Sequence, residues 1–156
     1  MSSIGWQQRR ACLRTATFNA ILMIPDTIGE TILVIDDCEN ICELIELLLV
    51  RVGYVVRTAT NAADALALAH SMRELDVVLC GLELPDMPGE QLAPLISAEH
   101  PSASIILVSA SFKPSEPQKY QGVLEKPFTI AELRTVVRSA LRGTPAFAES
   151  TLWAAL

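Results

Sequence analysis

Residues 31–37 decide the fold, and they read Thr31-Ile32-Leu33-Val34-Ile35-Asp36-Asp37. The first five form an unbroken apolar run rich in β-branched side chains, which is typical of a parallel strand buried on both faces. Two adjacent carboxylates end this run, so we expect Asp36 and Asp37 at the carboxyl end of a strand. In an open parallel sheet, ligands bind at that end.

Apolar runs and amphipathic segments alternate along the rest of the chain. We expect further strands at residues 54–58, 76–81, 104–108 and 122–125. Helices are expected at 39–51, 61–72, about 90–98 and 129–142, ended or capped by Gly53, Asn61 and Thr129. Pro94 fits the third helix only near its first turn. This alternation predicts one doubly wound α/β domain with a parallel sheet covered on both faces.

The first of these helices has a clear apolar stripe. Its core-facing residues are expected to be Ile41, Leu44, Ile45, Leu48 and Leu49. We interpret the stripe as core packing rather than as a groove for a partner. Cys38 and Cys42 are four residues apart and share a helix face, and we expect both to pack in the core as well.

Composition excludes several classes of function. The 156 residues are 51% hydrophobic, which is enough for a substantial core, and the formal net charge of -6 argues against a nucleic-acid binder that neutralises phosphates. No run of 18 apolar residues occurs, so we expect no membrane-spanning helix. Four irregularly placed cysteines do not form a disulfide framework. These features favour a reduced, cytoplasmic, acidic globular domain with no membrane or nucleic-acid partner.

We divide the chain into an N-terminal extension (1–29), a domain (30–142) and a C-terminal tail (143–156). Residues 1–25 contain Arg9, Arg10 and Arg14 but no acidic residue, as in a transit peptide or signal n-region. Their apolar stretch is short and runs into a proline. The alternative is a dispensable or loosely helical extension upstream of a start at Met23. The tail holds Trp153 and is expected to dock on its own domain or on a partner, or to fray.

Polar residues collect where the predicted strands end. They are Asp36 and Asp37 after the first strand, Gly81 after the third, Ser109 after the fourth, and Lys126 with Pro127 after the fifth. Paired carboxylates suit Mg²⁺, and a hydroxyl facing a lysine suits the oxygens of a phosphoryl group. A dinucleotide site is excluded, because an acidic segment follows the first strand where a glycine-rich turn is required.

In this order, the motifs resemble the receiver domain of two-component response regulators. They are Ile-Asp-Asp, then Asp-Val-Val-Leu-x-x-Leu-x-Leu-Pro-Asp-Met-Pro-Gly, then Ile-Ile-Leu-Val-Ser-Ala, then Leu-Glu-Lys-Pro-Phe, all within residues 30–142. The resemblance implies a flavodoxin-like sheet of five parallel strands in the order 2-1-3-4-5. It also implies phosphoryl transfer from a histidine kinase to an aspartate that ends the third strand.

The resemblance assigns a role to each polar residue. Asp36 and Asp37 match the metal-binding acids, Ser109 matches the hydroxyl that contacts the phosphoryl group, and Lys126 matches the lysine of the site. Pro127 matches a proline that is often cis in the family.

Three features depart from the family pattern. Gly81 stands where the phosphoacceptor aspartate belongs, and glycine has no side chain to act as a nucleophile. Val123 stands where the family has its switch aromatic. Residues 109–126 form a short segment with two prolines, so we expect the helix before the fifth strand to be short or broken. Together these departures predict a degenerate receiver, or pseudo-receiver, that works without phosphorylation.

Other residues are alternatives for the missing carboxylate. Glu83 lies two positions after Gly81, on the same face of an extended chain, and could pair with Lys126 or a cation. Alternatively it is a solvated loop residue. Asp86 is expected to serve the turn. Without an acid at position 81, Mg²⁺ should bind weakly or not at all, and Lys126 should reach across to the paired acids instead.

The expected function is therefore that of a signalling module in two-component phosphorelay. It would act by contact with a protein partner such as a histidine kinase or a regulator. The resemblance further implies homodimerisation through the fourth and fifth helices and the fifth strand. The alternative is a phosphate-responsive receiver that uses a non-standard acceptor or binds an anion at Ser109 and Lys126. No base, nucleophile and oxyanion donors occur together, so we expect no enzyme.

Overall fold

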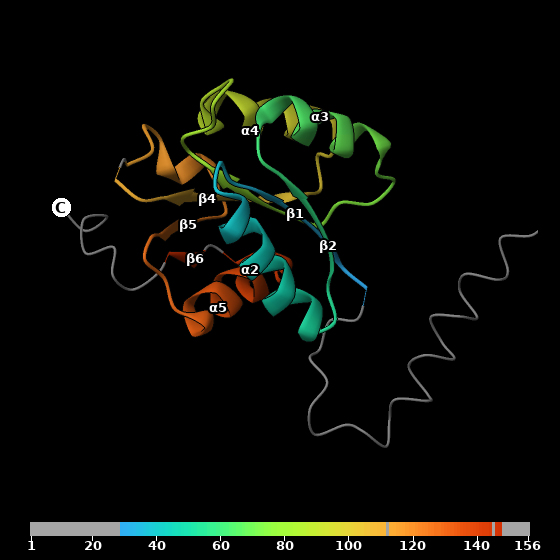
Figure 1. Ribbon diagram of the computed structural model, residues 1–156, viewed down its shortest axis with the longest axis vertical. Coiled ribbons are helices and arrows are strands. Elements are labelled where there is room, and N and C mark those ends of the chain that lie inside the picture. Colours follow the sequence, from blue (N-terminus) through green and yellow to red (C-terminus); the bar gives the residue numbers. More distant parts are fainter. Residues whose placement is uncertain (1–28, 112, 145, 148–156) are drawn as a thin grey trace, which may run out of the picture.

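The predicted strands form one parallel sheet in the computed structural model, which describes residues 29–111, 113–144 and 146–147 (Figure 1). In chain order the strands are β1 (Thr31–Ile35), β2 (Val55–Ala59), β3 (Val77–Gly81), β4 (Ser104–Ser109), β5 (Gly122–Glu125) and β6 (Ala146–Phe147). They lie side by side in the order β2-β1-β3-β4-β5-β6, and each neighbouring pair is parallel. The predicted order 2-1-3-4-5 is confirmed for the first five strands.

The sixth strand is an addition that the sequence pattern does not predict. Gly122 and Val123 of β5 lie opposite Ala146 and Phe147. Thr144 donates from both its backbone N–H and its hydroxyl to a carbonyl in the last turn of the preceding helix, each at 3.1 Å. This turn directs the chain back along the edge of β5.

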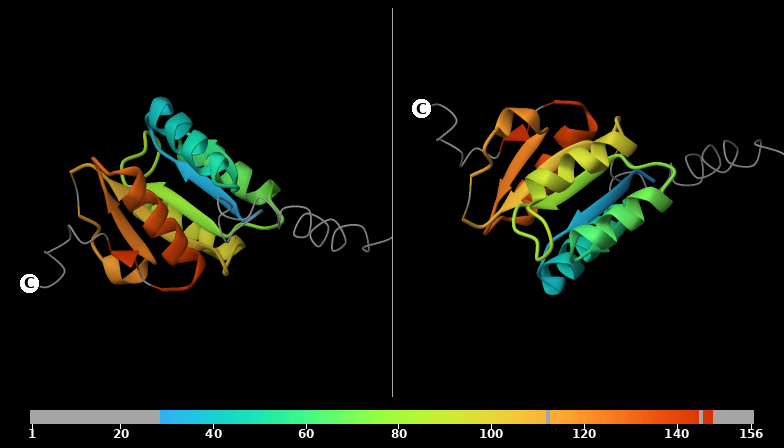
Figure 2. Two further views of the ribbon diagram at one scale, coloured as in Figure 1. Left: turned by 90° about the horizontal axis from the view of Figure 1, so that it is seen from below. Right: turned by 90° about the horizontal axis from the view of Figure 1, so that it is seen from above.

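Helices cover both faces of the sheet. They are α2 (Glu39–Arg51), α3 (Ala62–Ser71), α4 (Gly89–Glu99) and α5 (Ile130–Leu141), with a short 3-10 helix, η2 (Pro117–Lys119). The helices α2 and α5 pack on one face, and α3 and α4 pack on the other, as the opposite views in Figure 2 show. No helix among the described residues is long and apolar enough to cross a membrane.

The predicted helix ends are confirmed. Asn61 caps α3 by accepting a hydrogen bond from the Asp64 N–H at 2.8 Å. Thr129 and Glu132 form a reciprocal capping box at the start of α5. Gly53 follows α2 with a φ of 102°, a conformation that favours glycine.

Two local predictions need correction. α4 continues through Pro94, which lies inside the helix rather than near its first turn. Its missing N–H leaves one carbonyl without a helical partner, but Pro94 is exposed, so water can bond that carbonyl. Leu44 is not in the core: α2 buries Cys42, Ile45 and Leu49, while Leu44 is 49% exposed.

The connection between β4 and β5 is irregular, as predicted. Its helical part, in the residues that the structure describes there, is η2 alone. Glu90 in the first turn of α4 holds this connection: its carboxylate accepts from the Ser115 N–H at 2.7 Å and from the Ser115 hydroxyl at 3.1 Å. The segment is therefore tied to α4 by side-chain contacts rather than by a long helix of its own.

Candidate functional site

The carboxyl ends of four strands meet at one edge of the sheet. Asp36 directly follows β1, Gly81 ends β3, Ser109 ends β4 and Lys126 directly follows β5. The strand registers place these ends level. Ile35 of β1 lies opposite Cys80 of β3, Gly81 of β3 lies opposite Val108 of β4, and Ser109 of β4 lies opposite Glu125 of β5. The polar residues singled out in the sequence thus gather at one place.

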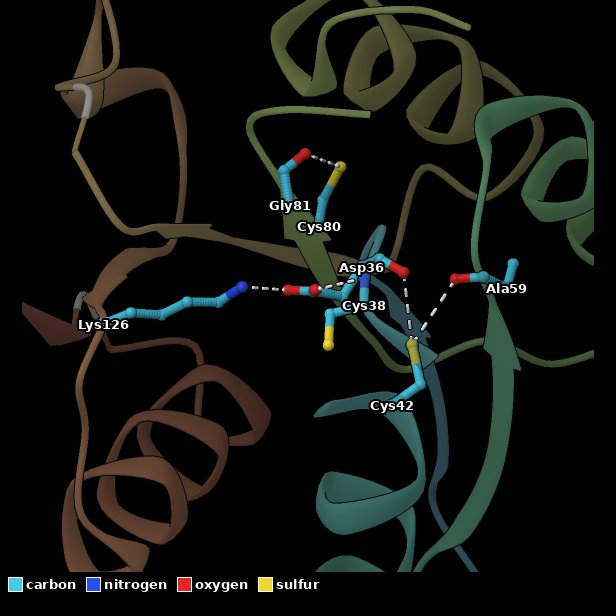
Figure 3. Close-up of polar contacts among 7 residues, drawn as sticks. All are labelled: Asp36, Cys38, Cys42, Ala59, Cys80, Gly81 and Lys126. Atoms are coloured by element: carbon cyan, nitrogen blue, oxygen red, sulfur yellow. Dashed lines mark hydrogen bonds and ion pairs between the residues drawn. The ribbon is translucent and has the colours of Figure 1, made fainter. Parts of the chain in front are cut away.

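Asp36 and Lys126 form an ion pair across this edge (Figure 3). The Asp36 side chain is 3% exposed, and its Oδ2 accepts a hydrogen bond from the Lys126 Nζ. Its Oδ1 accepts from the Cys38 N–H at 3.0 Å. The backbone N–H of Lys126 donates to the backbone carbonyl of Ser109 at 2.7 Å, which fixes the position from which the lysine side chain extends. Both oxygens of the buried carboxylate are therefore satisfied by the protein itself.

The remaining acids do not join this pair. Asp37 and Glu83 are exposed. Within residues 29–111, 113–144 and 146–147, no three His, Cys, Asp or Glu side chains gather as a metal site would require. A divalent cation at Asp36 would have to displace the ammonium of Lys126. The residues present consequently do not fit Mg²⁺ in this arrangement, although the lysine reaches an acid of the pair as the sequence suggested.

Gly81 is packed closely against β1. A Cβ added at this position would lie 3.1 Å from the Ile35 carbonyl oxygen and 3.6 Å from the Asp36 Cα. The first contact is tight, so any side chain here requires β1 to shift by a few tenths of an ångström. A larger residue at position 81 would point into the space beside Asp36.

The loop after β3 folds back on the same backbone. The Gly89 N–H donates to the Leu82 carbonyl at 2.8 Å. A Cβ on Gly89 would lie 2.0 Å from the Gly81 carbonyl oxygen, which no structure tolerates. Glycine at position 89 is thus required for the close approach of this loop to the end of β3.

The cysteines near the site differ in exposure. Cys42 is buried, and its thiol contacts the carbonyls of Asp36 and Ala59 at 3.5 and 3.6 Å. Burial raises the pKa of Cys42 to about 11, with a smaller contribution from the Asp36 carboxylate. Burial also raises the pKa of Cys80 to about 12. Cys38 is exposed at the N-cap of α2, so its predicted place in the core is wrong.

Asp86 has a structural contact that the sequence does not reveal. Its two carboxylate oxygens accept hydrogen bonds from the N–H groups of Ala62 at 2.8 Å and Ala63 at 2.9 Å, at the start of α3. These bonds lower the pKa of Asp86. The residue therefore ties the β3–α4 loop to a helix more than twenty residues away in sequence, rather than serving only its own turn.

The other predicted residues lie at or beside this edge. Ser109 is 5% exposed at the end of β4, and Val123 is 3% exposed on β5. The Lys126–Pro127 peptide bond is cis. The structure thus brings Asp36, Gly81, Ser109 and Lys126 together and leaves Asp37 and Glu83 at the surface.

Comparisons with known proteins agree with this architecture. The chain is 31% identical over 121 residues to the probable transcriptional regulatory protein TcrX of Mycobacterium tuberculosis, a match that covers 73% of this chain and 50% of that protein. It is 36% identical over 117 residues to the DNA-binding transcriptional regulator NtrC of a Bradyrhizobium species, over 71% of this chain and 24% of that protein. The chain therefore spans about half the length, or less, of these relatives.

A solved structure and a family profile extend the comparison. The signal receiver domain of an HD domain-containing protein from Pseudomonas fluorescens Pf-5 is 29% identical, with a TM-score of 0.67, over 73% of this chain and 95% of that one. The profile described as the response regulator receiver domain matches residues 32–138. With its flavodoxin-like sheet and this match, the chain belongs to the response regulator receiver domain family of two-component signalling.

Proposed function

We propose that this chain is a receiver domain that accepts no phosphoryl group and signals by binding a protein partner. The observation that carries the proposal is Gly81 at the carboxyl end of β3, beside a lysine already paired with Asp36. In phosphoryl transfer from acetyl phosphate, a carboxylate oxygen must form a bond to phosphorus while the bond from phosphorus to acetate breaks. Glycine supplies no such oxygen.

Neighbouring carboxylates do not replace the missing one in this arrangement. Asp86 is engaged with the start of α3, and Asp36 has both oxygens occupied. Glu83 is exposed. Non-covalent binding of an anion is also disfavoured, because the Lys126 ammonium already faces a buried carboxylate that would repel a second negative group.

The remaining role is recognition by another protein. We propose a signalling partner such as a histidine kinase or a regulator, with the cytoplasm as the compartment, no nucleic-acid contact of its own and no enzymatic activity. Receiver domains are in general signalling modules rather than enzymes, and the parallel sheet with helices packed on both faces is present here. Pairing of two copies through the β4–β5 connection, β5 and α5 is a further part of this proposal.

The test is phosphorylation by a small donor. The natural protein, Gly81→Asp and Gly81→Asn are each incubated with acetyl phosphate and Mg²⁺, and their intact masses are recorded. We expect no phosphoryl adduct on the natural protein or on Gly81→Asn, which has the shape of aspartate but no nucleophile. An adduct on Gly81→Asp alone would show that the pocket lacks only its acceptor.

An adduct on the natural protein would refute the proposal and direct the search to Glu83 or Asp86. Because the Cβ at position 81 is tightly placed, thermal melting of both variants should accompany the mass measurement. If Gly81→Asp does not fold, the result on the natural protein still decides the question. Pull-down with candidate kinases and regulators then tests the binding role.

A further inference from the structure

The outward face of α2 carries a band of large apolar side chains. Leu44, Leu47 and Val50 are 49%, 54% and 50% exposed. They follow one another at intervals of three residues, so neighbouring members lie on adjacent positions of the helix surface. The core-facing side of α2 is already filled, so this α2 band is apolar surface beyond what the fold requires.

The same helix surface is acidic. Glu39 and Glu43 are exposed and Glu46 is half-buried, and the basic residue of α2 is Arg51 at its last position. A segment that covers the α2 band should therefore combine apolar side chains with positive charge.

Residues 1–28 have this composition. They contain Arg9, Arg10 and Arg14, and the first acidic residue is Asp26. Their apolar stretch, residues 18–24, reads Phe-Asn-Ala-Ile-Leu-Met-Ile. The charges precede the apolar stretch by a few residues, so the segment has one basic part and one apolar part.

The chain enters the domain beside the α2 band. The Gly29 N–H donates to the Gly53 carbonyl at 3.3 Å, and Gly53 lies two residues past the end of α2. Residues 18–24 are therefore tethered to the end of α2 that carries Val50. A helix of 13 residues is about 20 Å long, and an extended chain covers about 3.3 Å per residue, so residues 9–14 can reach the other end.

We propose that residues 1–28 bind the α2 band of the same chain. In this arrangement, residues 18–24 cover Leu47 and Val50, and the arginines face the acidic residues near the start of α2. Tethering supports the contact, because a short linker gives an effective concentration of about 1 mM. The bound segment would shield this face from protein partners, and this inference holds whether or not the domain accepts a phosphoryl group.

Limited digestion with trypsin tests the proposal on the full chain, since cleavage after Arg14 requires a released segment. The rate of this cleavage is compared with that of a synthetic peptide of residues 1–28. We expect slower cleavage in the protein than in the peptide. In Leu47→Ser the cleavage rate should rise about fivefold, because the bound segment no longer buries the exposed half of a leucine side chain. The control is Leu95→Ser, which alters a leucine of similar exposure (45%) on α4 and should leave the rate unchanged.

The contact should also depend on charge and be independent of protein concentration. Glu43→Gln and added salt should each speed cleavage, because both weaken the attraction between the arginines and α2. Cleavage at the rate of the free peptide, or equal rates in Leu47→Ser and Leu95→Ser, would overturn the proposal. Protection that grows with protein concentration would also overturn it, since the occupant would then be a second copy of the chain.

Discussion

Removal of the Lys126 charge should destabilise the protein more than removal of the Asp36 charge. In Lys126→Met, the Asp36 carboxylate stays 97% buried without its counter-ion, as its side chain is only 3% exposed. Breaking a buried pair by removing one partner costs about 3–5 kcal/mol. Because Lys126 is 23% exposed, water can partly replace it, and we expect the lower end, about 3 kcal/mol.

Asp36→Asn should cost less, about 1 kcal/mol, for two reasons. The amide keeps an acceptor for the Cys38 N–H, and the freed ammonium can turn toward solvent. The double variant Asp36→Asn with Lys126→Met leaves no buried charge and should recover most of the stability lost in Lys126→Met alone.

Urea unfolding monitored by circular dichroism measures these differences, with the slope of the transition checked for two-state behaviour. For a chain of this size, a loss of 3 kcal/mol corresponds to a decrease in Tm of about 6–12 °C. The reasoning fails if Lys126→Met costs no more than Asp36→Asn. It also fails if the double variant is as unstable as Lys126→Met, because the loss would then come from packing rather than from charge.

Three further predictions concern the surroundings of this pair. Gly89→Ala should unfold the protein or destabilise it by about 3 kcal/mol or more, because the new Cβ would collide with the Gly81 carbonyl oxygen. Gly143→Ala is the control: Gly143 has a φ of 71° but open space around it, so the change should cost about 1 kcal/mol. Thermal melting of the two variants compares these losses of stability. Asp86→Asn should lower stability at neutral pH. Because the pKa of Asp86 is lowered in the fold, that difference should hold above pH 4. It should then be lost progressively as the pH falls from the ordinary value of 3.8 through the lowered pKa, in acid titrations of both proteins. Among the described cysteines, Cys38 alone should react quickly with a thiol reagent at pH 8, since burial raises the pKa of the other two to about 11 and 12; peptide mapping would identify the labelled thiol.

The fold was predictable because its signals are local. The run 32–35 has no polar side to expose and is rich in β-branched residues, which favours a central strand, and it is 0–1% exposed from Ile32 to Ile35. Asn61 and Thr129 each place an oxygen within reach of an N–H three residues on, which fixes a helix start in the sequence itself. Strand order followed from the family resemblance, which the parallel alternation supported but did not determine alone.

Features that depend on distant contacts were not predictable. Asp86 binds the start of α3 across more than twenty residues of sequence, and no spacing in the sequence encodes this contact. Leu44 fits the helical stripe by periodicity, but the width of the buried face is set by how α2 sits on the sheet, which leaves Leu44 outside. β6 has two residues, too few for a periodic signal, and exists because β5 offers an unpaired edge.

The charges at the end of the sheet bear on the proposal that position 81 carries no acceptor. With an aspartate at position 81, Asp36, Asp37 and that residue would bring three negative charges toward one ammonium, and the excess would favour a divalent cation. With Gly81, this edge holds the buried Asp36 carboxylate and the partly exposed Lys126 ammonium, and Asp37 lies in solvent. Lys126 can then neutralise Asp36 alone. Under the proposal above, this ion pair is the arrangement that electrostatics favours when position 81 carries no acid, and it places the Lys126 ammonium where a cation would otherwise bind Asp36.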